Sequence, residues 1–142
     1  MTPILIPPIL AGAIAQGIKF LIKTNKQKFS FKNLLTYSGM PSGHSAMVVA
    51  LAMAVFLEEG WDSAIFALSF ILAIIVIRDA LGIRRYLGRH GRTINILIKD
   101  LGEDKFLDEE YPHLLENVGH TPAQVVVGSL IGLLVAVVIY IL

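Results

Sequence analysis

The sequence predicts an all-α integral membrane protein with about four transmembrane helices and one amphipathic helix at the membrane interface. Hydrophobic residues make up 55% of the 142-residue chain and charged residues only 16%, which is too apolar for an ordinary soluble domain. The apolar residues gather in four stretches, and the segment before the last of these repeats its apolar residues with helical spacing. We therefore predict a single membrane domain over residues 1–142.

The four predicted spans cover residues 4–22, 44–58, 63–82 and 121–142. The first is apolar except for Gln16 and Lys19, and its length is about what a helix needs to cross a hydrocarbon layer. A signal peptide is the weaker alternative for this stretch, because no basic residue precedes it.

The second predicted span is shorter than the others. Residues 44–58 can cross the membrane only if their polar beginning lies within the protein, since unpaired backbone groups are not tolerated in lipid. A re-entrant helix is the alternative. Residues 121–142 form the most apolar stretch. Four crossings bring both termini to the same side of the membrane.

Basic residues are confined to two of the three connections. Residues 19–32 contain five lysines and no acidic residue, and residues 78–105 contain the other seven of the 12 basic residues. The remaining connection, EEGWD, has acidic residues and no basic one. Because positive charge is retained in the cytoplasm, the connections 23–43 and 83–120 are predicted to be cytoplasmic. The predicted location is a plasma or inner membrane.

The third connection begins with the predicted amphipathic helix. Its apolar residues recur at alternating steps of four and three, which is typical of a helix at a membrane surface. Gly88 and Gly91 weaken this helix, and Gly102 is its predicted end. The acidic segment 100–110 is predicted to be a solvated loop. The apolar stripe consists of Ile83, Leu87, His90, Ile94, Leu97 and Leu101.

The sequence MPSGHS stands at the beginning of the second span. Ser42 or Ser45 can cap the first turn of the helix, and Pro41 suits a turn that leads into it. Gly43 lets the backbone approach an anion closely, and the free amide groups and dipole of a helix N-terminus favour a phosphate-like group. His44 therefore lies where an anion would bind.

A second helix start, GHTP, opens the fourth span. Thr121 is the candidate cap, Pro122 suits the first helical position, and His120 stands directly before them. The second and fourth spans both begin on the cytoplasmic side, where the third span ends. This topology gathers on one membrane face the residues His44, His120, Arg78, Asp79, Arg84 and Arg85.

This set of residues suits phosphoryl transfer. A histidine near the positive end of a helix is kept neutral, so its imidazole can attack phosphorus while a second histidine protonates the leaving oxygen. Arginines match the phosphate oxygens and stabilise charge on the transferring group. A carboxylate or an amide can orient the attacking ring. Such a scheme requires neither a metal nor a cofactor.

Three motifs together resemble a known family. In this order, GMPSGHSA, DALGIRR and GHTPAQVVVG are similar to motifs of the divergent small-membrane-protein branch of the type 2 phosphatidic acid phosphatase superfamily, which also includes the vanadium haloperoxidases. The resemblance covers nearly the whole chain. It implies a phosphatase that acts on a lipid phosphate or diphosphate. In such an enzyme His120 would form a phosphohistidine and His44 would protonate the leaving group, while Ser42 and Gly43 would contact phosphate.

The chain departs from the superfamily pattern at several points. Gln124 stands where the superfamily has an aspartate that orients the nucleophile, and Leu114 stands where it has an arginine. The first signature of the superfamily is absent. These departures favour the alternative of a non-catalytic protein that binds or transports a lipid phosphate. The residues expected to orient the site are Gln124, Asp79 and Thr121, and those expected to bind phosphate include Arg78, Arg84, Arg85, Lys19 and Lys23.

A third function class, a structural membrane subunit, stays open. Arg84 and Arg85 can simply anchor a helix to anionic lipid, and Arg78 can pair with Asp79 for structural reasons. GSLIG at 128–132 presents small residues for close helix packing within the chain or between chains, and a homodimer is compatible with the small size. Nucleic-acid binding is not expected, because the basic residues lie beside membrane spans.

Overall fold

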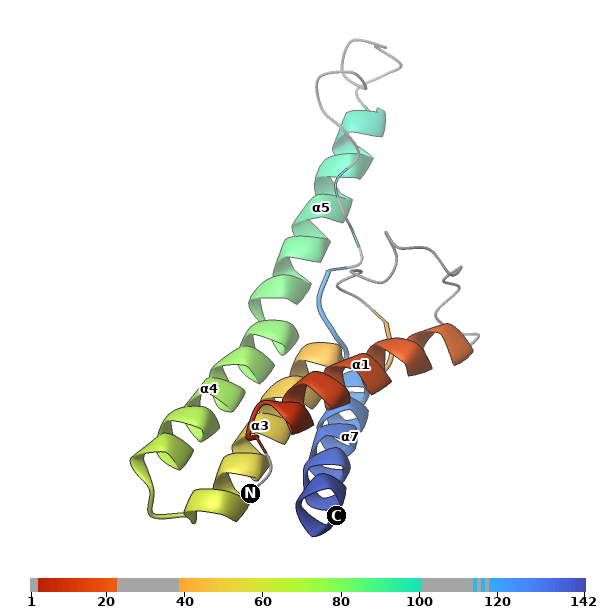
Figure 1. Ribbon diagram of the computed structural model, residues 1–142. Helices are drawn as coiled ribbons and strands as arrows, with labels where there is room; N and C mark the ends of the chain where they lie inside the picture. The colour runs from red at the N-terminus through yellow and green to blue at the C-terminus, as the bar shows by residue number, and fades with distance from the viewer. Residues whose placement is uncertain (1–2, 23–38, 101–113, 115, 117) are drawn as a thin grey trace.

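The computed structural model describes residues 3–22, 39–100, 114, 116 and 118–142, and every regular element among them is a helix (Figure 1). Each helix end lies within two residues of the corresponding predicted span, which confirms the all-α fold class. Most of the connection 23–43 and the acidic segment after residue 100 lie outside the described residues. The helices are α1 (Ile6–Leu21), α3 (Gly43–Glu59), α4 (Ala64–Leu81), α5 (Ile83–Asp100) and α7 (Pro122–Ile141).

Helix α3 is the centre of the bundle and packs against α1, α4 and α7. Figure 1 shows both termini at one end of the bundle, together with the turn between α3 and α4. The beginnings of α3 and α7 and the end of α4 lie at the other end, and α1 crosses α3 obliquely. The topology therefore brings the two histidine-bearing helix starts to the same end.

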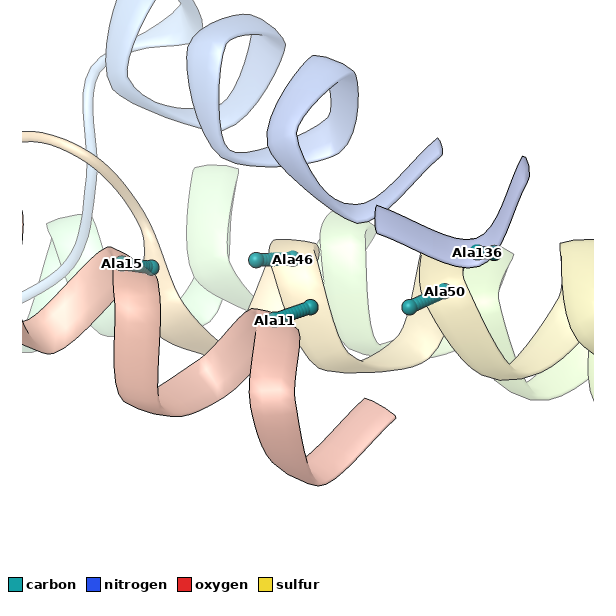
Figure 2. Close-up of a cluster of buried hydrophobic side chains, with 5 residues drawn as sticks. All are labelled: Ala11, Ala15, Ala46, Ala50 and Ala136. Carbon is teal, nitrogen blue, oxygen red and sulfur yellow. The ribbon is translucent and has the colours of Figure 1, made fainter. Parts of the chain in front are cut away.

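The core of the bundle is built from alanine. Five alanines from α1, α3 and α7 are almost completely buried and face one another (Figure 2). Small side chains at a helix interface let the backbones approach closely and gain van der Waals contact, which drives helix association where lipid replaces water. The cluster consists of Ala11, Ala15, Ala46, Ala50 and Ala136.

Two glycines bring α7 into direct backbone contact with α3. A Cβ atom on Gly128 would overlap the carbonyl oxygen of Ser42, and one on Gly132 would overlap the carbonyl oxygen of Ala46. The GSLIG motif is therefore used for packing within the chain. This contact sets the distance between the beginnings of α3 and α7.

Polar caps define where the helices begin. Ser42 caps α3 and accepts a hydrogen bond from the Ser45 amide at 3.3 Å. Thr121 caps α7 and forms a capping box with Gln124. Both predicted caps are confirmed, and of the two serines considered for α3 it is Ser42 that takes this role. Each cap satisfies backbone donors that the first turn of a helix leaves without partners.

Helix α5 follows α4 directly after Gly82 and continues in nearly the same direction, away from the bundle (Figure 1). The glycines at 88 and 91 do not interrupt it. They lie instead on its buried side together with Asn95, whereas the predicted apolar stripe is exposed at Ile83, Leu87, Ile94 and Leu97.

In the part of the chain that the structure describes, two helical stretches are long and apolar enough to cross a membrane, Ala64–Lys99 and Pro122–Ile141. Helices α1 and α3 have 16 and 17 residues. At about 1.5 Å per residue they fall short of the roughly 30 Å of hydrocarbon. Large apolar side chains such as Leu68, Ile75, Leu134 and Val138 point outward from α4 and α7, as expected for helices surrounded by lipid.

Candidate active site

The candidate site lies where α3 and α7 begin. The Ser42 amide donates a hydrogen bond to the carbonyl oxygen of Gln124 at 3.0 Å, which joins the start of α3 to the first turn of α7. Ser42 is completely buried, and its hydroxyl oxygen accepts hydrogen bonds from both the amide and the hydroxyl of Ser45. Two helix N-termini with their partial positive charge are therefore neighbours, an arrangement that favours an anion.

His120 is buried at this junction, with only 2% of its surface exposed. Its backbone amide donates to the carbonyl oxygen of Ala80 at 3.0 Å, in the last turn of α4. Gly119 precedes it with a φ of 98° and packs against the backbone of Arg84 and Arg85, where a side chain would not fit. The ring is thus held at the meeting point of α4, α5 and α7.

The imidazole of His120 has a defined tautomer. Gln124 Oε1 accepts the backbone amide of Thr121 at 2.9 Å, which identifies this atom as the oxygen of the side-chain amide. The same oxygen lies 3.3 Å from Nδ1 of His120, so Nδ1 must carry the hydrogen and donate it. Nε2 therefore has a free lone pair.

Nε2 of His120 is a buried nitrogen without a hydrogen-bond partner among the described residues. Leaving a buried polar atom unpaired costs about 1–3 kcal/mol, and such atoms are rare outside functional sites. An unpaired lone pair is what a nucleophile needs.

Positive charge surrounds the two histidines. Burial lowers the pKa of His120, and the charges of Lys19, His44 and Arg84 lower it further, while the hydrogen bond with Gln124 acts in the opposite direction. His120 is therefore neutral near neutral pH. The charges of Arg84, Lys19 and Asp79 also act on His44, which is half-buried in the first turn of α3. These interactions bring residues from the five described helices into one site.

Helix α1 supplies a buried cation. Lys19 is 3% exposed and continues the line of Ala11 and Ala15 along the helix, so the small-residue stripe of α1 ends in a charge. One turn earlier, the side-chain amide of Gln16 lies over Gly43, with its atoms 3.6 and 3.7 Å from the position of a Cβ there. Gln16 was not predicted as a site residue. Its signal in the sequence is that it and Lys19, three positions apart, share one helix face in an otherwise apolar stretch.

Of the three candidate arginines, the structure directs Arg84 to the site. Its side chain forms an ion pair with Asp79 across Gly82, and both side chains are about one-third exposed. Arg78 and Arg85 are exposed, and the charges that act on the two histidines come instead from Arg84 and Lys19. Asp79 therefore holds the side chain of Arg84, and its role in orienting the site stays a prediction.

Leu114, which stands where the superfamily has an arginine, lies against α5. Leu114 is 42% exposed and is hydrogen-bonded through its backbone to Asn95 of α5. It does not bring a side chain into the site. Lys23 lies outside the described residues.

Comparisons with known proteins identify the family of the chain. A family model described as "Divergent PAP2 family" matches residues 1–135. The chain is 37% identical to "Uncharacterized membrane protein YuiD" of Bacillus subtilis (strain 168), over 142 residues that cover 92% of this chain and 87% of that protein. No solved structure matches the chain. The resemblance expected from the motifs is confirmed: the chain belongs to the divergent PAP2 family of membrane proteins.

Proposed function

We propose that this protein is a membrane-embedded phosphatase that hydrolyses a lipid phosphate or diphosphate through a phosphohistidine on His120. The observation that carries the proposal is the state of the His120 ring. Its Nδ1 is held by Gln124, its Nε2 is buried with no hydrogen-bond partner in the described part of the chain, and the charges of Lys19 and Arg84 act on it. A neutral, oriented imidazole among positive charges is suited to attack a phosphate ester.

In the first half of the proposed reaction, the Nε2 lone pair of His120 attacks phosphorus. A bound phosphate dianion favours the imidazolium form of His44. The bond between phosphorus and the ester oxygen of the lipid breaks, and His44 donates its proton to that oxygen. The lipid alcohol leaves, or a lipid monophosphate if the substrate is a diphosphate. The phosphoryl group is then bonded to Nε2, and Gln124 continues to accept the Nδ1 hydrogen.

In the second half, water attacks the phosphohistidine. Neutral His44 takes a proton from this water, the bond between Nε2 and phosphorus breaks, and inorganic phosphate is released. His120 is neutral again and His44 is protonated, so the cycle is closed. No step calls for a metal or a cofactor.

The phosphoryl oxygens would be held by several groups that converge on the two helix starts. Lys19 and Arg84 supply charge, and Ser42 and the backbone of Gly43 supply donors at the positive end of α3. The basic residues flanking the spans support an orientation with this end at the cytoplasmic face.

Phosphate release by detergent-purified protein tests the proposal. The panel contains phosphatidate, phosphatidylglycerol phosphate, and polyprenyl phosphate and diphosphate, each with and without vanadate or a chelator. We expect release that vanadate stops, that the chelator spares and that His120→Ala abolishes. His90→Ala is the matched control, because His90 is exposed on α5. Release that survives His120→Ala would refute the mechanism.

Gln124 favours a second candidate, a lipid-phosphate-binding protein without turnover. An amide orients the ring but cannot stabilise the imidazolium with a charge, as an aspartate would. For this candidate, folded wild-type protein would bind lipid phosphates and release no phosphate from any of them. His120→Ala would leave much of that binding intact.

A further inference from the structure

The segment that leads into His120 is fastened to α5 by one side chain. The Nδ2 group of Asn95 donates to the carbonyl oxygen of Leu114 at 2.9 Å and to Oε1 of Glu116 at 2.9 Å. Its Oδ1 atom accepts the amide of Leu114 at 3.0 Å. Asn95 therefore pairs with Leu114 through a donor and an acceptor at once, as a neighbouring backbone would.

The same face of α5 is shaped to let this segment approach. A Cβ atom on Gly88 would overlap the carbonyl oxygen of Glu116 and would lie 3.1 and 3.2 Å from backbone atoms of Val118. Gly88, Gly91 and Asn95 are buried, whereas most of α5 is exposed. The buried line on α5 therefore begins with two glycines and ends with the side-chain amide of Asn95, and the segment approaches the helix along this line.

Fixed points lie on both sides of this segment. Asn95 holds it at Leu114, and the His120 amide donates to Ala80 at its far end. Between them, Gly119 turns the chain with a φ of 98° against the start of α5. His120 follows Glu116 by four residues and Leu114 by six, so the position of its backbone depends on how these residues sit on α5.

We infer that Asn95 is a positioning residue for His120, acting through the 114–119 segment; this inference rests on the proposed function of His120 as the nucleophile. Asn95 itself touches no reacting atom. Moving a reacting group by about 1 Å can cost roughly 100-fold in rate. Release of the segment from α5 therefore lowers the turnover rate while the groups that bind phosphate stay in place.

Asn95→Asp tests the inference most sharply, because it keeps the shape and the Oδ1 acceptor but removes the Nδ2 donor and adds a charge beside Glu116. Gly88→Ala perturbs the same segment from a different residue. Thr93→Ala is the control, since Thr93 is exposed on the same helix and bonds only to the Arg89 carbonyl oxygen. All variants are compared at equal amounts of folded protein, checked by gel filtration and thermal unfolding in detergent.

Two readouts are measured for each variant. The first is the division of the effect between kcat and KM for lipid phosphate. The second is the rate at which diethyl pyrocarbonate modifies His120, located by peptide mass spectrometry with exposed His90 as internal reference. For Asn95→Asp and Gly88→Ala we expect kcat to fall at least about tenfold with KM nearly unchanged. We also expect diethyl pyrocarbonate to modify His120 at least about fivefold faster, because loss of hydrogen bonds allows local opening. Thr93→Ala leaves both readouts at the wild-type values.

Wild-type kcat together with wild-type protection of His120 in both segment variants would overturn the inference. The chemical modification does not depend on turnover. If wild-type protein releases no phosphate, the proposed function fails, and faster modification of His120 in the segment variants still establishes that Asn95 positions it.

Discussion

Gln124 is the residue on which the chemistry of this site depends most. It replaces the aspartate expected at this position, and its carbonyl oxygen accepts from both the Thr121 amide and His120 Nδ1. One amide therefore closes the first turn of α7 and selects the tautomer of His120, the proposed nucleophile. Because this position carries no negative charge, the pH profile of kcat/KM is expected to change when a carboxylate is introduced here.

Gln124→Glu is expected to shift the pH profile of kcat/KM. The nucleophile must be unprotonated, so activity is present above the pKa of His120 and is lost as the pH falls through it. Burial lowers the pKa of His120, which puts the acid limb of the wild type below the pH at which an ordinary histidine titrates. A carboxylate would keep both hydrogen bonds and favour the imidazolium, so the pKa of His120 rises and the limb moves to higher pH.

Gln124→Leu removes the acceptor of the Nδ1 hydrogen and should lower kcat by about 100-fold, because the ring is no longer oriented. Ser63→Ala is the matched control for the loss of a hydrogen bond that caps a helix. Ser63 caps α4 by accepting from the Phe66 amide at 3.1 Å, so its loss costs about 1 kcal/mol of stability.

An acid limb that stays unmoved in Gln124→Glu would argue against His120 as the titrating nucleophile.

Lys19→Met tests the buried cation. Methionine has a similar length and no charge, so the packing of α1 is preserved. A hydrogen bond to a charged group contributes about 1.5–3 kcal/mol, and its loss should raise KM for lipid phosphate and weaken vanadate inhibition by about tenfold or more. Lys99→Met, on an exposed position of α5, should change neither constant. Unchanged values in Lys19→Met would remove Lys19 from the site.

At the scale of the helices, the glycines have two different roles. On α7 they allow backbone contact with α3, as the small-residue spacing of GSLIG indicates. On α5 Gly88 and Gly91 were expected to weaken an amphipathic helix, yet they line its buried side. This role could not be predicted, because the segment that packs on them lies more than 20 positions further along the chain, and nothing in the local pattern of α5 indicates it.

Gly132→Ala is expected to destabilise the bundle. The new Cβ would overlap the Ala46 carbonyl oxygen, and overpacking of this kind costs about 1–3 kcal/mol. Gly17→Ala is the control, because a Cβ there meets nothing within 4 Å and removing a helical glycine gains about 0.5–1 kcal/mol. Thermal unfolding in detergent should separate the two variants in opposite directions. A Gly132→Ala protein as stable as wild type would contradict the packing described for α3 and α7.

For the whole molecule, the helix boundaries were predictable because they depend on local signals. Apolar runs set the lengths, and Ser42 and Thr121 mark the starts. That His44 and His120 lie at the same end of the bundle was predictable from topology, since α3 and α7 both begin there. The choice of Arg84 over its neighbour Arg85 was not, because successive residues on a helix point about 100° apart and only the fold shows which of the two pairs with Asp79.

The membrane topology predicted from the four spans and the basic connections can be measured directly. The chain has no cysteine, so single cysteines introduced at Trp61 and at Thr93 report on the turn after α3 and on α5 without background. We expect an impermeant maleimide to label Trp61→Cys in intact cells and Thr93→Cys only after permeabilisation. Labelling of both from the same side would contradict four crossings.

A homodimer stays a prediction. The face of α7 formed by Gly128 and Gly132 is occupied by α3, so a second copy would have to bind elsewhere on the bundle. Exposed apolar side chains on α4 are available for either lipid or another helix.

The central claim is that His120 carries the phosphoryl group during turnover, and trapping that group tests it most directly. Wild-type, His120→Ala and His90→Ala proteins are mixed with the lipid phosphate that is hydrolysed fastest, quenched in alkali to preserve phosphohistidine, digested and analysed by mass spectrometry. We predict a phosphoryl group on His120 in the wild type and in His90→Ala, and none in His120→Ala. A hydrolytically active wild type with the phosphoryl group on another residue, or on none, would contradict the account.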